Sequence, residues 1–162
     1  DVLVEAIPQV QQQRPDIHFL IAGNPDSTEM NTLAQAKQQT NTQVYAGFVP
    51  YEDAWRYFYA ADVVVFPYRD VYQSGALSTA MVFGKPVIVT DVGGLPEVVQ
   101  GNGWVVPSED APALARAIRT ALDDKPQLQR MGDTSRELIE KVYCPQVIAE
   151  RTRGVYQQIM SM

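Results

Sequence analysis

The sequence contains one cysteine and one histidine in 162 residues, and it is poor in basic side chains. Cys144 alone cannot form an internal disulfide, and together with His18 it leaves little for a zinc site. The 13 Lys and Arg against 19 Asp and Glu give a formal net charge of -6. Non-specific nucleic-acid binding depends on surplus basic side chains. We therefore expect neither a metal site nor a nucleic-acid partner.

Long hydrophobic runs are also missing. No apolar run approaches the roughly 20 residues that span a bilayer, and no signal peptide is visible. A cytoplasmic location is the expectation. At 162 residues, with 46% hydrophobic and 20% charged residues, the chain is expected to form one globular domain over residues 1–162. The absence of an initiator Met and the abrupt helical start predict a fragment of a longer protein.

The apolar residues form short continuous runs that alternate with runs at helical spacing. Such alternation predicts an α/β fold, a Rossmann-like parallel sheet with helices on both faces. The run at 17–22 suits a strand covered on both faces, and the helix at 51–61 is expected to bury Trp55, Phe58 and Tyr59. The expected strands are 17–22, 44–46, 63–66, a run that starts at 87, and 104–106. The expected helices begin at 2, 28, 51, 74, 97, 111 and 145, and a further helix takes in Leu128 and Met131.

Four loops follow these strands, at residues 23–26, 47–50, 67–74 and 91–95. Ligands of parallel α/β sheets bind at the carboxyl ends of the strands, where these loops lie. The loop at 67–74 leads into a helix that starts with Ser74, Gly75 and Ala76. Its first backbone N–H groups lack intrahelical partners, so they can bind an anion without a basic side chain. The alternative is an ordinary strand-helix crossover whose loop only turns the chain.

Other polar residues have simpler explanations. Arg69 can neutralise a phosphate, although a surface role is favoured for it. We expect Asp91 to cap its glycine loop and Glu97 to cap or brace the next helix. His18 suits a strand end and Cys144 a packing position. No catalytic residue is assigned.

The run Gly84-Lys85-Pro86-Val87-Ile88-Val89-Thr90-Asp91-Val92-Gly93-Gly94-Leu95-Pro96-Glu97-Val98-Val99, preceded by Ala80-Met81, points to a known family. It resembles the C-terminal domain of retaining glycosyltransferases of the GT-B fold, in family four. The resemblance covers nearly the whole chain. Its further matches are the first helix at 2–6, the strand at 19–23, the loop at 47–49 and the Ala-Ala-Asp at 60–62.

The resemblance implies a site for a nucleoside diphosphate sugar, which is a substrate and not a cofactor. The nucleobase would lie against Phe48 and Val49, and the diphosphate against Ser74, Gly75 and Ala76. The implied reaction moves the sugar to an acceptor with retention of anomeric configuration, and it requires no metal. The acceptor-binding N-terminal half lies outside this chain, and any membrane contact would come through that half.

Two family glutamates, eight residues apart, contact the donor sugar and the ribose, and they fall at Val71 and Thr79. Neither is a glutamate here. Thr79 retains a hydroxyl for the ribose, and Tyr72 or Gln73 can take over the sugar hydroxyls. The Gln-Ser-Gly start resembles a variant branch of the family, which favours altered donor recognition over an inactive relative. The alternative function is a noncatalytic nucleotide-binding or interaction module on the same scaffold.

The family's first strand in this domain would precede Asp1. The resemblance places it in the middle of the sheet, in the common strand order 3-2-1-4-5-6. Without it we expect one of three outcomes: a gap, direct pairing of residues 17–22 with 63–66, or a strand borrowed from a neighbouring molecule.

Overall fold

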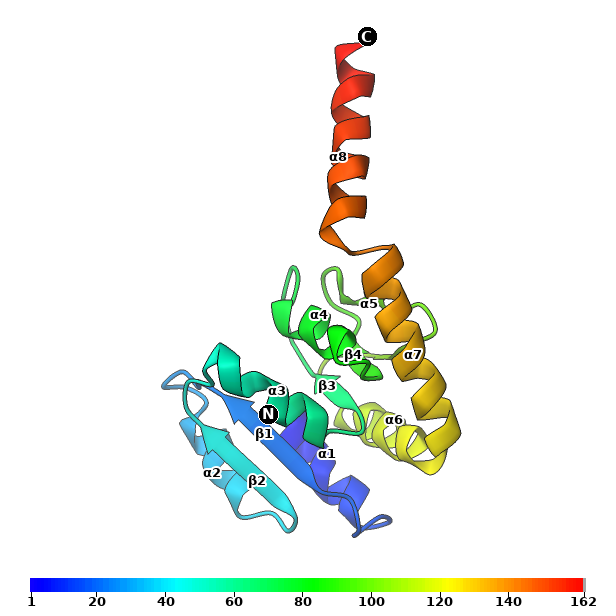
Figure 1. Cartoon of the computed structure of the whole chain (residues 1–162). Coiled ribbons are helices and arrows are strands. Elements are labelled where there is room, and N and C mark those ends of the chain that lie inside the picture. The colour runs from blue at the N-terminus through cyan, green and yellow to red at the C-terminus, as the bar shows by residue number, and fades with distance from the viewer. Residues whose placement is uncertain (162) are drawn as a thin grey trace.

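The structure is a computed structural model that describes residues 1–161. Helices and short strands alternate through the first two thirds of the chain, and helices alone follow (Figure 1). The strands are β1 (Phe19–Gly23), β2 (Thr42–Ala46), β3 (Val64–Phe66), β4 (Val87–Thr90) and β5 (Gly103–Val106). The helices are α1 (Val2–Gln11), α2 (Met30–Lys37), α3 (Tyr51–Ala60), α4 (Gly75–Val82), α5 (Leu95–Val98), α6 (Ala111–Asp123), α7 (Lys125–Lys141) and α8 (Pro145–Met160).

All strand pairs are parallel, as predicted, but they form two separate sheets. One sheet has the order β1-β2 and the other the order β3-β4-β5. Phe19 is opposite Thr42 in the first sheet, and Val64 is opposite Val87 in the second. The carboxyl ends of the strands, and the loops that follow them, therefore lie at one edge of each sheet.

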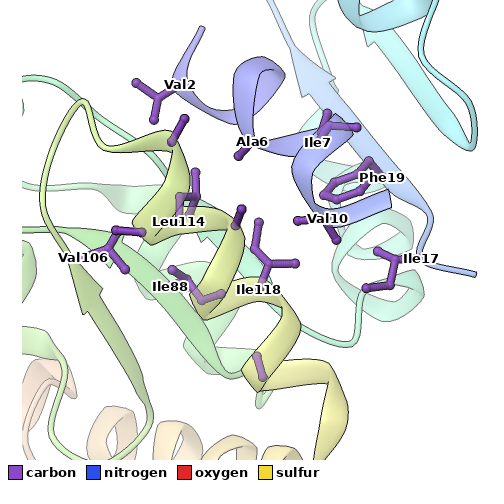
Figure 2. Packing of buried hydrophobic residues seen from close by; sticks show 14 of the residues in the cluster. Val2, Ala6, Ile7, Val10, Ile17, Phe19, Ile88, Val106, Leu114 and Ile118 are labelled. Atoms are coloured by element: carbon purple, nitrogen blue, oxygen red, sulfur yellow. The ribbon is translucent and has the colours of Figure 1, made fainter. Parts of the chain in front are cut away.

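One hydrophobic cluster joins the two sheets. α1 packs against α6, and both helices place apolar side chains beneath the strands. Ile7 and Val10 of α1 and Leu114 and Ile118 of α6 are at most 2% exposed. Figure 2 shows these side chains together with Phe19 of β1 and with Ile88 and Val106 of the second sheet. The helix pair thus links sheets that do not pair with each other.

A second cluster covers the other face of the three-stranded sheet. It contains Leu77 and Met81 of α4, Val89 of β4 and Leu95 of α5. Helix α7 packs closely against the turn that follows α4. A Cβ on Gly132 of α7 would lie 2.3 Å from the carbonyl oxygen of Gly84 in that turn. These contacts hold α4 firmly, and its N-terminus faces the loop edge.

The space between β1 and β3 is a cavity. Its volume is about 820 Å³, and it is lined by the facing edges of the two strands, by α3 and by Leu3. Within residues 1–161, β1 and β3 make no strand pairing with each other. Of the three outcomes expected for the missing central strand, the structure therefore has the gap.

Asp1 marks the edge where such a strand would end. Its carboxylate pairs with Arg69, which follows β3, and Arg69 also pairs with Glu109, which follows β5. Asp1 therefore lies at the carboxyl edge of the strands. A strand that ended there and led into α1 would run parallel to β1 and β3.

The gap explains two predictions that were wrong. The β1 strand is not covered on both faces, because Leu20 is 45% exposed. Helix α3 has no buried residue, and Trp55 and Tyr59 are 47% and 69% exposed while Phe58 is half-buried. This helix lies across the gap (Figure 1), so the sheet surface that it would cover is incomplete.

Helix α8 extends away from the rest of the molecule (Figure 1). None of its residues is buried, and its apolar side chains at Val155, Tyr156 and Ile159 are 55% to 64% exposed. Its start at Pro145 agrees with the sequence prediction. Cys144 precedes it as a half-buried N-cap residue with no capping hydrogen bond from its side chain.

Candidate functional site

The site is built on the first turn of α4. Ser74 is the N-cap residue, with extended backbone angles, and its hydroxyl oxygen accepts a hydrogen bond from the Leu77 N–H at 3.2 Å. This is the usual role of serine at a helix start. The prediction that the helix opens at the Ser-Gly pair is confirmed.

The first three N–H groups of this turn remain available. In the described chain, the backbone N–H groups of Ser74, Gly75 and Ala76 make no hydrogen bond. Gly75 and Ala76 are exposed, and a Cβ on Gly75 would meet nothing within 4 Å. The electropositive end of an eight-residue helix therefore opens onto free space, which is the arrangement that binds anions.

Thr90 of β4 holds the loop before the helix in place. The Thr90 hydroxyl donates to the carbonyl oxygen of Tyr68 at 2.7 Å, and it is 1% exposed. The Tyr68 hydroxyl lies 3.3 Å from the Ser74 hydroxyl. The last residue of β4 thus positions the loop, and the loop positions the helix cap.

The glycine loop at 91–95 also contacts the loop at 67–74. Gly94 N–H donates to the carbonyl oxygen of Tyr72 at 3.0 Å. Gly93 has a φ of 52°, and a Cβ there would lie 1.7 Å from the carbonyl oxygen of Val71. The loops at 67–74 and 91–95 therefore meet, as their place at the carboxyl ends of adjacent strands predicts.

The arginine in the loop before the helix is already paired. Arg69 contacts Asp1 and Glu109, so its charge is balanced, and the favoured surface role agrees with the structure. Asp91 accepts a hydrogen bond from Ser108 N–H at 2.8 Å, so its carboxylate braces the loop after β5 and not, as predicted, its own glycine loop. An anion at Gly75 would therefore be bound by backbone N–H groups.

The predicted nucleobase loop lies on the other sheet. Phe48 is 74% exposed and Val49 half-buried, and Gly47 N–H donates to the Gly23 carbonyl at 2.8 Å. Helix α3 begins directly after this loop. Its first residues, Tyr51 and Glu52, line a pocket together with Thr79 and Phe83 of α4. The loop at 47–50 and the α4 site are thus neighbours across the α3–α4 groove.

The positions of the two missing glutamates differ in their surroundings. Val71 is half-buried in the second hydrophobic cluster. The Thr79 hydroxyl donates to the carbonyl of Gly75 at 2.9 Å, so toward a ligand it is free only to accept. Tyr72 is 91% exposed and Gln73 is exposed, so both are accessible. Glu52 lines the same groove as Thr79, and no local sequence pattern indicates this because only the packing of α3 beside α4 brings the two residues to one groove.

Residues 1–161 contain no group of three or more His, Cys, Asp or Glu side chains placed to hold a metal ion. Over the same residues, no helix has the length and apolar character needed to cross a membrane.

Comparison with known proteins identifies the family. The glycosyl transferases group 1 family matches residues 1–124. The chain belongs to this family, and its fold is that of the C-terminal domain of GT-B glycosyltransferases.

Individual relatives agree with this assignment. A GDP-mannose-dependent monoacylated alpha-(1-6)-phosphatidylinositol monomannoside mannosyltransferase of Corynebacterium glutamicum is 30% identical over 167 residues. The match covers 97% of this chain and 43% of that relative. The chain therefore spans less than half the length of this curated relative.

Solved structures show the same fold. Sucrose-phosphate synthase from Thermosynechococcus elongatus matches with a TM-score of 0.79 and 27% identity, over 98% of this chain and 42% of that one. Anabaena HepE, solved in complex with UDP, matches with a TM-score of 0.79 and 19% identity, over 99% of this chain and 44% of that one.

Proposed function

We propose that this chain is the donor-binding half of a retaining glycosyltransferase. It binds a nucleoside diphosphate sugar with the diphosphate at Ser74, Gly75 and Ala76, and the whole protein transfers the sugar to an acceptor. Relatives support a nucleotide donor, because one is GDP-mannose-dependent and one structural neighbour holds UDP. The cytoplasmic location remains a prediction.

Gly75 carries this proposal. Its φ is not positive and a Cβ on it would contact nothing, so neither backbone conformation nor packing within residues 1–161 requires glycine there. Glycine at a helix start has no stability advantage over residues with a side chain. Close approach of a ligand to the backbone explains it, and the three free N–H groups make that ligand an anion.

The same groups have a role in the proposed reaction. The bond between the anomeric carbon and the diphosphate oxygen breaks, and the oxygen of an acceptor hydroxyl bonds to the same face of the carbon while its proton passes to the departing diphosphate. Negative charge grows on the departing diphosphate in an oxocarbenium-like transition state. Preorganised N–H groups aimed at that oxygen lower the barrier, because they need no reorientation as the charge develops.

A proline substitution at Gly75 tests the diphosphate site. Gly75→Pro removes one N–H but suits the first helical position, because Ser74 already has the extended conformation that precedes proline (φ -126°, ψ 113°). We expect this variant to fold normally and to bind UDP or GDP about tenfold more weakly in calorimetric titration. The control Gly75→Ala keeps the N–H and shows what the lost space alone contributes.

The proposal fails if the full-length protein binds none of UDP, GDP and ADP. It also fails if nucleotide binds and Gly75→Pro leaves the affinity unchanged.

A further inference from the structure

A groove between α3 and α4 lies near the proposed diphosphate site. Its volume is about 270 Å³, and it is lined by Tyr51, Glu52, Ala54, Trp55, Thr79 and Phe83. Thr79 lies four residues beyond Gly75, which is about 6 Å along a helix. The groove therefore begins about one helical turn from the proposed diphosphate site.

Two aromatic residues of the groove, Trp55 and Phe83, are held by ring contacts. The Phe83 ring stacks on Phe58 at 5.4 Å between centroids, and it forms a T-shaped pair with Tyr59. Trp55 packs edge-on against Tyr59 at 5.9 Å. Such a surface suits the apolar face of a sugar or a base ring.

Glu52 is the one acidic residue among those lining the groove, and its carboxylate is uncommitted. Glu52 makes no hydrogen bond or ion pair with any residue in 1–161, whereas the neighbouring Asp53 pairs with Arg56 at 3.3 Å. The Thr79 hydroxyl donates its hydrogen bond to the carbonyl oxygen of Gly75, so toward a ligand it can only accept one. Glu52 and Thr79 therefore offer acceptors to the groove, which match a ligand that brings hydroxyl donors.

A ribose has two adjacent hydroxyl groups, and a carboxylate is the protein group best suited to accept from both. The ribose of a nucleoside diphosphate is joined directly to the phosphate, so it would lie next to the diphosphate site. We propose that Glu52 binds the ribose hydroxyls and makes this protein selective for ribonucleotides over 2′-deoxyribonucleotides. This inference rests on the proposed donor function and assigns the ribose contact to α3.

Removing the charge of Glu52 changes the nucleotide affinity in opposite directions with and without a ribose contact, and this makes the proposal testable. A carboxylate near a diphosphate repels it, so removing the charge at Glu52 should strengthen binding if the side chain makes no ribose contact. If Glu52 accepts hydrogen bonds from the ribose, Glu52→Gln should weaken binding instead. Asp53→Asn is the matched control, because it removes the same charge from the adjacent residue of the same helix.

The experiment measures UDP and 2′-deoxy-UDP, or the guanosine pair if GDP binds more tightly, by calorimetry on the full-length protein. We expect the wild type and Asp53→Asn to prefer the ribonucleotide by about tenfold and Glu52→Gln to lose this preference. Circular dichroism verifies that each variant is folded. An unchanged preference in Glu52→Gln overturns the Glu52 assignment while leaving the donor function intact. If the wild type binds no nucleotide, both proposals fall.

Discussion

Gly93 is the position where a single methyl group most directly tests the construction of the site. Its φ of 52° costs a residue with a side chain about 1–2 kcal/mol. A Cβ would also lie 1.7 Å from the Val71 carbonyl oxygen, so the loop must move. Overpacking of this kind typically costs about 1–3 kcal/mol. Gly93→Ala is therefore expected to lower the free energy of unfolding by about 2–5 kcal/mol.

Gly101→Ala separates the two contributions. Gly101 also has a positive φ, 84°, but a Cβ there would meet nothing within 4 Å. It should lose only the backbone contribution, about 1–2 kcal/mol. Urea unfolding followed by circular dichroism measures both variants. Because the movement of Val71 also displaces the segment that leads to Ser74, Gly93→Ala should bind nucleotide more weakly and Gly101→Ala should not. Equal stability losses in the two variants would refute the close contact between the loops.

Three further outcomes are expected. A six-residue Val- and Ile-rich strand fused ahead of Asp1 should raise the urea midpoint by filling the gap between β1 and β3, whereas the same extension with alternating prolines, which cannot pair, should not. The hydrogen bond from Arg14 lowers the pKa of Asp16 from 3.8 to about 2, so this pair stabilises the fold fully above pH 4 and loses its effect as the pH falls toward 2. An NMR titration should show the Asp16 pKa returning toward its ordinary value in Arg14→Gln, and no change would contradict the pairing. If Gln73 contacts the donor sugar, Gln73→Ala in the full-length protein should abolish donor hydrolysis with little effect on UDP affinity. Nucleotide binding without hydrolysis or transfer in the wild type would favour the noncatalytic module.

Local sequence signals predicted the elements that carry the anion site. The Ser-Gly pair, the apolar run at 87–90 and the Gly-Gly loop each contain their own turn or capping chemistry, so spacing was sufficient to place them. Helix α3 shows where such reasoning stops. Its apolar residues have helical spacing, but how deeply they are buried depends on a sheet surface that residues 1–161 do not complete.

Glu52 shows a second limit. It lies 27 positions before Thr79 in the sequence, and nothing in its local pattern distinguishes it from Asp53, which pairs with Arg56 on the surface. The packing of two helices brings Glu52 to the groove. Contacts between elements distant in sequence have no periodicity of their own, so they became visible only in the folded chain.

The most direct test of the central claim is an amide NMR titration of the chain with UDP and with GDP. If the N-terminus of α4 binds the diphosphate, the N–H resonances of Ser74, Gly75 and Ala76 will be among those that shift most, and they will saturate with nucleotide concentration. The corresponding nucleoside without phosphates should move them far less. Saturable binding that leaves these three resonances unmoved, or the absence of saturable shifts with either nucleotide, would contradict the assignment.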